Sequence, residues 1–196
     1  MSVDSAALLR RVFQETVAAH DRFAATHLPV LVAAADAIVR CLSNGGKVIA
    51  FGNGGSAADA QHFVTELVGR FEVERRSLPG IALTADSNVL TAIANDYGFE
   101  AVFSRQIDGL GQAGDIAFGI STSGGSLNVL RALEAATAAG LITVALTGRD
   151  GGPIGQAARI HINVSEPSTP RVQEVHRTVL HAICALVDEG LGFAPR

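Results

Sequence analysis

Five short apolar runs, separated by segments with helical spacing, constrain the fold of this chain most strongly. Runs such as residues 115–120 and 141–146 are apolar except at Asp115 and Thr143, and they do not alternate with polar residues. Strands of this kind are covered on both faces, which is typical of parallel sheets. Alternation of such strands with helices predicts an α/β fold with an open, doubly wound, mostly parallel five-stranded sheet. The expected strands cover residues 47–51, 80–84, 115–120, 141–146 and 159–164.

Apolar residues recur at helical spacing between and before these runs. Two N-terminal helices are expected over residues 5–20 and 28–43, the second ending at Asn44-Gly45-Gly46. Such helices pack either on their own sheet or on another copy of the chain, and their wide apolar stripes favour association. We predict one domain over residues 1–196, including the helical segment 5–43. The later helices are expected at 56–70, 87–95, 126–139 and 170–189, the last with Pro170 in its first turn.

Composition excludes several classes of protein. Apolar residues make up 48% of the chain and charged residues 17%, which is typical of a packed globular protein. The formal charge of −4 offers no basic surface for nucleic acid. No unbroken apolar window reaches about 18 residues, so no membrane span is expected. The N-terminus has no secretory pattern, and Cys41 and Cys184 are expected to be buried thiols, so we predict a cytoplasmic protein.

A glycine-rich loop, Gly52-Asn53-Gly54-Gly55-Ser56, joins the first expected strand to a helix. Backbone N–H groups at such a helix start favour an anion. A dinucleotide fingerprint is one alternative, but Ala57 occupies its third glycine position and Glu72 and Glu74 do not lie at a strand end. A purely structural tight turn is the other alternative.

A second loop, Ser121-Thr122-Ser123-Gly124-Gly125-Ser126, follows the strand at 115–120 and precedes a helix. Ser126 is a plausible N-cap, which is a structural role. Capping requires one hydroxyl only, so the other three are surplus. Four hydroxyls and two glycines suit a phosphomonoester that is bound by hydroxyls and backbone amides.

His62 and Glu66 lie four residues apart, so they share a helix face one turn after the first loop. They form either a simple exposed pair or part of a site. The last helix carries Gln173, His176 and His181, and a single helical histidine is more often structural. His62, Glu66, Gln173 and His181 together could bind a divalent metal such as zinc. Gln173 and His181 are about 12 Å apart along one helix, so both reach one ion only by leaning together or by donation from different subunits.

The segment Asn95-Asp96-Tyr97-Gly98 ends an expected helix. It is read either as a C-cap and turn, or as an Asn95–Asp96 pair that binds sugar hydroxyls. Position alone does not separate these two interpretations.

In combination these segments resemble the phosphoheptose isomerases of the sugar isomerase (SIS) fold. The resemblance covers nearly the whole chain and is carried by these segments: GNGGSAADAQHF (52–63) with Glu66, TAIANDYGFE (91–100), ISTSGGSLNV (120–129), ALTGRDGG (145–152), and TPRVQEVH (169–176) with His181. It implies a homotetramer with active sites at subunit interfaces. It also implies interconversion of sedoheptulose 7-phosphate and D-glycero-D-manno-heptose 7-phosphate, the first step toward bacterial lipopolysaccharide heptoses. Relatives often carry a longer side chain at Gly125.

The resemblance also implies residue roles. Glu66 and His181 would be the acid–base pair, and our hypothesis makes Glu66 the base and His181 the acid. The zinc ligands would be His62, Glu66, Gln173 and His181. The sugar and phosphate would be held by Asn53, Gly54, Gly55, Asn95, Asp96, Ser121, Thr122, Ser123 and Ser126, with a contribution from the adjoining Ser56.

Two rival functions remain at this point. Related SIS-fold tetramers bind a replication initiator protein as scaffolds and lack the enzyme's residues. The presence of His62, Glu66, Gln173 and His181 favours an enzyme. The second rival is an isomerase of another sugar phosphate with the same fold.

Overall fold

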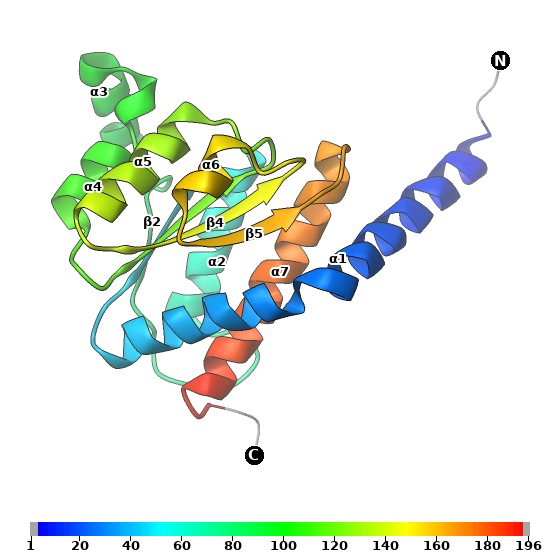
Figure 1. Cartoon of the computed structure of the whole chain (residues 1–196), viewed down its shortest axis with the longest axis horizontal. Coiled ribbons are helices and arrows are strands. Elements are labelled where there is room, and N and C mark those ends of the chain that lie inside the picture. The colour runs from blue at the N-terminus through cyan, green and yellow to red at the C-terminus, as the bar shows by residue number, and fades with distance from the viewer. Residues whose placement is uncertain (1–3, 194–196) are drawn as a thin grey trace.

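The computed structural model describes residues 4–193 and contains one five-stranded, wholly parallel sheet (Figure 1). Its strand order is β2-β1-β3-β4-β5, with each strand pairing in parallel register with its neighbours. The five expected strands are confirmed, with ends within two residues of prediction. The strands are β1 (Val48–Gly52), β2 (Gly80–Ala82), β3 (Ile116–Ser121), β4 (Ile142–Gly148) and β5 (Ile160–Val164).

Helices cover both faces of the sheet, as a doubly wound fold requires. One face carries α1 (Ser5–Ser43), α2 (Gly55–Val68) and α7 (Thr169–Gly190). The other face carries α3 (Ser87–Tyr97), η1 (Phe99–Ala101), α4 (Ser104–Leu110), α5 (Leu127–Ala138) and α6 (Gly152–Ala157). Pro170 lies in the first turn of α7, as predicted.

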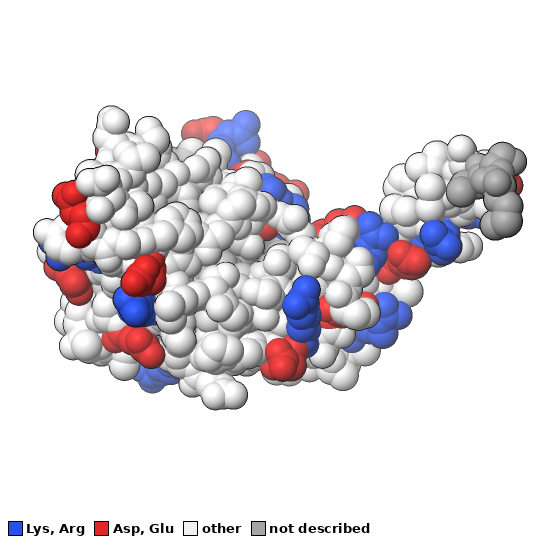
Figure 2. All heavy atoms as spheres, turned by 90° about the horizontal axis from the view of Figure 1, so that it is seen from above, with Lys and Arg blue, Asp and Glu red and all other residues white. Residues whose placement is uncertain are grey.

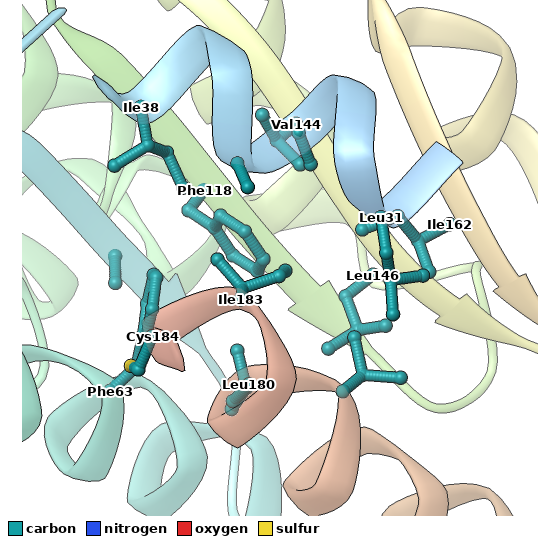
Figure 3. Packing of buried hydrophobic residues seen from close by; sticks show 14 of the residues in the cluster. Leu31, Ile38, Phe63, Phe118, Val144, Leu146, Ile162, Leu180, Ile183 and Cys184 are labelled. Carbon is teal, nitrogen blue, oxygen red and sulfur yellow. The ribbon is translucent and has the colours of Figure 1, made fainter. Parts of the chain in front are cut away.

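The larger core lies between the sheet and the α1, α2 and α7 layer. Figure 3 shows Phe118 of β3 between Ile38 of α1 and Ile183 of α7, and all three side chains are fully buried. Alternate residues of the same strands, such as Phe51 and Ala117, face the second core under α4 and α5. The central strands β1 and β3 are buried along their whole length, which explains their unbroken apolar runs. Cys41 and Cys184 are buried free thiols, as expected.

The prediction of two N-terminal helices is wrong. A single helix of 39 residues, α1, runs from Ser5 to Ser43 and contains Pro29. The intervening residues 21–27 are compatible with a helix, and an internal proline costs one backbone hydrogen bond and a local kink without ending the helix. Figure 1 shows the second half of α1 lying along the sheet and the first half extending away from the body.

The extended half of α1 exposes a row of apolar side chains. Leu9, Phe13 and Val17 lie four residues apart on one side of the helix and are 59%, 70% and 60% exposed. Figure 2 shows this arm standing clear of the body, and acidic and basic side chains interspersed over the face in view. An apolar stripe without cover on a protruding helix is typical of an association surface.

By length and composition alone, α1 could cross a membrane, the one helix in residues 4–193 for which this holds. Its second half supplies Leu31, Ala34 and Ile38 to the large core, and each is at least 96% buried. This is the packing of a core helix of the sheet domain.

Strand topology places one edge of the sheet for ligand binding. Strands β1 and β3 are neighbours in the sheet, and the chain leaves them toward opposite faces. Helix α2 follows β1 on one face, and α5 follows β3 on the other. In open α/β sheets such a switch point opens a crevice beyond the carboxyl ends of the strands. The loops after Gly52 and Ser121 both leave from this edge, where Gly52 pairs with Ile120.

Candidate active site

Three potential metal-binding or acid–base side chains converge on the outer side of α2 and α7. One ligand atom from each of His62, Glu66 and His181 lies within 4.8 Å of the others. The Nε2 atoms of His62 and His181 are 2.7 Å apart, and His62 Nε2 is 3.4 Å from Glu66 Oε1. All three side chains are half-buried. A single chain therefore brings together residue 66 and residue 181.

The two helices meet because their sequences place small and apolar residues on facing sides. Ala60, Phe63 and Leu67 of α2 and Leu180, Ile183 and Cys184 of α7 are buried in the same core. His62 and Glu66 occupy the next face of α2, one helical turn apart. Parallel passage of α2 and α7 then sets His181 beside them.

Gln173 lies further toward the start of both helices. Its Nε2 atom is 3.3 Å from Asp59 Oδ2, and the side chain fills the space above Gly55. In the structure Gln173 thus bonds to Asp59, two turns before His181. Gln173 and His181 are thus separated along α7, as the sequence predicted. The compact group consists of His62, Glu66 and His181.

Charge around this group comes from Asp59 and Arg177. Asp59 is fully buried, and its Oδ1 atom has an Arg177 Nη2 atom 2.8 Å away but no hydrogen bond. Burial raises the pKa of the Asp59 carboxyl, against the opposing influence of Arg177 and of the hydrogen bond from Gln173. Burial and then the Arg177 cation lower the pKa of His62, while Glu66 opposes them. His62 is therefore held toward its neutral form, which is the form that binds a metal.

The glycine-rich loop lies at the start of α2. Gly54 has φ +54° and is the N-cap residue, and no side chain caps the helix there. Ser56 N–H donates to the Asn53 carbonyl at 2.9 Å and Ala57 N–H to the Gly54 carbonyl at 3.1 Å, so the N–H of the exposed Gly55 is the one left for another acceptor at this helix start. Ser56 is buried in the first turn and packs against Gly52.

The hydroxyl-rich loop has a similar form at the start of α5. Ser126 occupies the N-cap position, but its side chain makes no capping hydrogen bond. Its hydroxyl lies 3.1 Å from Ser121 Oγ, which is also 3.4 Å from Ser123 Oγ. Thr122 is half-buried in the same loop. The structure thus gathers three hydroxyls at an uncapped helix start, which is an arrangement suited to an anion.

A reciprocal amide pair joins the two loops. Asn53 Nδ2 donates to Asn128 Oδ1 at 2.8 Å, and Asn128 Nδ2 donates to Asn53 Oδ1 at 2.9 Å. Asn53 thereby fixes the first loop to the first turn of α5. Sequence reasoning did not single out Asn128, since an Asn inside a helix gives no distinctive signal.

Asn95 and Asp96 are not brought to this group. They lie on the exposed surface of α3, on the opposite face of the sheet from α2 and α7, and Asn95 Nδ2 donates to Asp96 Oδ1 at 2.8 Å. Helix α3 continues to Tyr97 and ends at Gly98, which has φ +89°. The C-cap is therefore Gly98, and Asn95 and Asp96 are helical residues.

Four residues near the group were not found from the sequence. Asp59 and Arg177 could have been found, because Asp59 shares the face of His62 and Glu66, and Arg177 lies midway between Gln173 and His181. Phe71 and Arg75 belong to the connection between α2 and β2, where no periodic pattern exists. The Phe71 ring lies 5.5 Å from the His181 ring between centroids.

Comparison with known proteins places this geometry in context. The SIS domain family model matches residues 12–148. A phosphoheptose isomerase of Geobacter metallireducens is 52% identical over 163 residues, covering 83% of this chain and 86% of that protein. The solved phosphoheptose isomerase of Neisseria gonorrhoeae has TM-score 0.88 and 45% identity, covering 93% of this chain and 99% of its own. The solved phosphoheptose isomerase of Francisella tularensis has TM-score 0.92 and 38% identity, covering 95% of this chain and 100% of its own.

Proposed function

The chain belongs to the phosphoheptose isomerase family of SIS-domain proteins and is a sugar-phosphate isomerase, and on this basis we propose how its residues act. The substrate is sedoheptulose 7-phosphate, converted to D-glycero-D-manno-heptose 7-phosphate through a cis-enediol. The observation that carries the proposal is the convergence of His62, Glu66 and His181 within 4.8 Å, from two helices of one chain.

The reaction moves one proton between adjacent carbons. The Glu66 carboxylate removes a proton from C1 of the ketose, and the C–H electron pair becomes the C1–C2 double bond. His181 supplies a proton to the C2 oxygen, which gives the enediol. Glu66 then returns its proton to C2 while the C1 hydroxyl loses its proton to His181, so the aldose forms and both groups regain their starting states. A carboxylate and an imidazole whose nearest ligand atoms lie within 4.8 Å of one another suit these roles.

The donor set also fits a divalent metal. Two imidazoles and a carboxylate are ligands that zinc accepts, and the lowered pKa of His62 favours the neutral ring that coordination needs. His62, Glu66 and His181 would hold the ion, and Gln173, which bonds to Asp59 two turns away in this chain, would be the fourth ligand by leaning toward the group or by donation from a neighbouring subunit. Zinc in such a site supplies a Lewis acid that stabilises negative charge on substrate oxygens.

Phosphate binding positions the substrate. The hydroxyls of Ser121, Ser123 and Ser126, with Thr122, take the 7-phosphate at the start of α5. Asn53, Gly54 and Gly55 with Ser56 line the sugar at the start of α2. Binding energy at the phosphate, remote from C1 and C2, holds the reacting carbons at Glu66.

Two features support a homotetramer with active sites at subunit interfaces. One is the exposed apolar row on the extended half of α1, and the other is the position of α3 on the opposite face of the sheet from His62, Glu66 and His181. Leu9, Phe13 and Val17 are exposed on a protruding helix, which a second copy would cover. Asn95 and Asp96 would then serve the sugar in a neighbouring subunit's site. We place the enzyme in the cytoplasm, at the first step of heptose precursor synthesis for lipopolysaccharide.

The decisive experiment follows sedoheptulose 7-phosphate by NMR with zinc-loaded protein. Appearance of aldose signals in the wild type, and their loss in Glu66→Gln, is the expected result. Absence of conversion by the folded wild type would overturn the proposal. A panel of pentose and hexose phosphates, compared by kcat/KM, checks the substrate: a higher value for another sugar phosphate would contradict the heptose assignment.

A further inference from the structure

Arg75 lies in the connection between α2 and β2, and its guanidinium is completely buried under the last turn of α2. Nη2 donates to the Glu66 carbonyl at 2.7 Å and Nη1 donates to the Leu67 carbonyl at 2.9 Å. Nη1 also donates to the Arg76 carbonyl at 3.0 Å. These carbonyls include two of the last four of α2, which have no partner inside the helix. A cation at this end also complements the helix dipole.

The same guanidinium reaches the helix that carries His181. Arg75 Nε donates to Asp188 Oδ1 at 2.7 Å, and the Asp188 side chain is 7% exposed. Asp188 lies seven residues, or about two turns, after His181 on α7. One buried side chain thus binds the backbone of Glu66 and the helix of His181 together.

A second residue of this connection contacts the site directly. The Phe71 ring lies 5.5 Å from the His181 ring, with 36° between their planes. Phe71 also packs against the large core. The connection therefore bears on both members of the pair, on Glu66 through a carbonyl and on His181 through a ring face.

We propose that Arg75 is a positioning residue, which sets the relative placement of Glu66 and His181 by bonding the Glu66 carbonyl and Asp188 at once. The inference rests on the proposed isomerase function and names no new reactant. Groups that orient metal or acid–base ligands from behind typically change metal affinity or activity about 10–100-fold when altered. A shift of the last α2 turn moves the Glu66 carboxylate away from the two imidazoles, although every catalytic side chain remains present.

The test separates positioning from stability alone. Arg75→Lys keeps the charge beside Asp188 but loses the fork that holds two carbonyls of α2. We expect kcat on sedoheptulose 7-phosphate to fall about 10–100-fold with less than about threefold change in KM, and zinc affinity by chelator competition to weaken about tenfold or more. Asp188→Asn leaves the bonds from Arg75 to α2 and weakens its link to α7. We expect this variant also to lower kcat and to weaken zinc affinity.

The matched control is another buried ion pair. Lys47 Nζ lies 2.6 Å from Asp115 Oδ2 at the amino ends of β1 and β3, and the ion pair and hydrogen bonds of these two side chains involve neither α2 nor α7. Lys47→Gln should lower the melting temperature and leave zinc affinity and kcat per folded protein unchanged. If Arg75→Lys and Asp188→Asn lower only the melting temperature, as Lys47→Gln does, Arg75 is a helix cap and the proposal is wrong.

Failure of the positioning proposal and failure of the proposed function are distinguishable. Wild-type protein that binds zinc but does not convert the substrate overturns the function. Zinc affinity still reports the placement of Glu66 and His181 in that case, because it requires no turnover. If Arg75→Lys does not fold, zinc affinity of Asp188→Asn decides: wild-type affinity overturns the proposal, and weakened affinity supports it.

Discussion

His62 and His181 face one another across 2.7 Å between their Nε2 atoms, although 119 residues separate them in the chain. A hydrogen bond at this distance needs an N–H on one ring and a lone pair on the other. As a hydrogen-bonded pair, the two rings hold one proton between two potential metal ligands. Coordination by both rings requires that proton to leave, so zinc binding and proton release are linked.

The first prediction concerns metal removal. Chelator treatment is expected to abolish turnover, and added zinc to restore it. His62→Asn removes one ligand and should weaken zinc binding about tenfold or more. Zinc affinity of the wild type should also fall as the pH drops below about 6.5, since protons then compete for His62, whose pKa is lowered from that value by burial. His27→Gln, a histidine that stacks on Phe23, is the control and should match the wild type. Full activity after verified zinc removal would contradict this prediction.

A second prediction concerns the base. Glu66→Gln keeps the shape of the side chain and the backbone bond from Arg75, but an amide does not accept the C1 proton. With zinc held saturating, kcat should fall about 10²–10⁴-fold. The control is Glu74→Gln, whose carboxylate is 90% exposed and pairs with Arg70, and it should retain wild-type kcat. Near-normal turnover by Glu66→Gln would remove Glu66 from the mechanism.

The sheet could be predicted from the sequence, because β1 and β3 are buried on both faces and leave continuous apolar runs. The continuity of α1 through Pro29 could not, since a proline inside a periodic stretch usually marks a helix boundary, whereas here the helix runs through it and buries Leu31 and Ile38 in the large core. Helix α6 has six residues, too few to show a period.

The site was predicted in part for similar reasons. His62 and Glu66 follow from local spacing, and the hydroxyl-rich loop from its composition. The approach of His181 depends on the packing of α2 beside α7, which no local pattern records. Arg75 acts through the backbone of Glu66, so no spacing rule points to it.

The third prediction is a pH dependence of stability that arises at His176. This histidine is fully buried, and its Nε2 atom lies 2.9 Å from the Thr147 carbonyl. A carbonyl only accepts, so Nε2 carries the proton and Nδ1 is a bare lone pair, buried without a partner. Burial, opposed by the Thr147 hydrogen bond, lowers the pKa of His176 to about 4.

The sign follows from proton uptake. Unfolded His176 takes up a proton near pH 6.5, whereas the folded form resists until about pH 4. Stability is therefore full above about pH 6.5 and falls as pH drops toward 4, by about 3 kcal/mol at most. His176→Gln can still donate to Thr147 but does not titrate. Denaturant unfolding from about pH 7.5 to 4 should give the variant a shallower loss, and parallel curves for the two proteins would contradict the prediction.

The fourth prediction compares two adjacent glycines of the hydroxyl-rich loop. Gly124 has φ +68°, and a Cβ there would collide with the backbone of Gly151. Gly125 lies outside the left-handed region, and a Cβ there would meet only Ser123 Oγ, at 3.9 Å.

Gly124→Ala should therefore distort the loop between Ser121 and Ser126, at a cost of about 1–2 kcal/mol for the backbone conformation alone. We expect KM for the heptose phosphate and the inhibition constant of inorganic phosphate to rise together, about tenfold, with kcat less affected. Gly125→Ala should leave both constants within about twofold of the wild type, since it adds a methyl group in open space. Equal effects of the two substitutions on phosphate inhibition would mean that the conformation of this loop does not govern anion binding, and the assignment of the 7-phosphate to Ser121, Ser123 and Ser126 would fail.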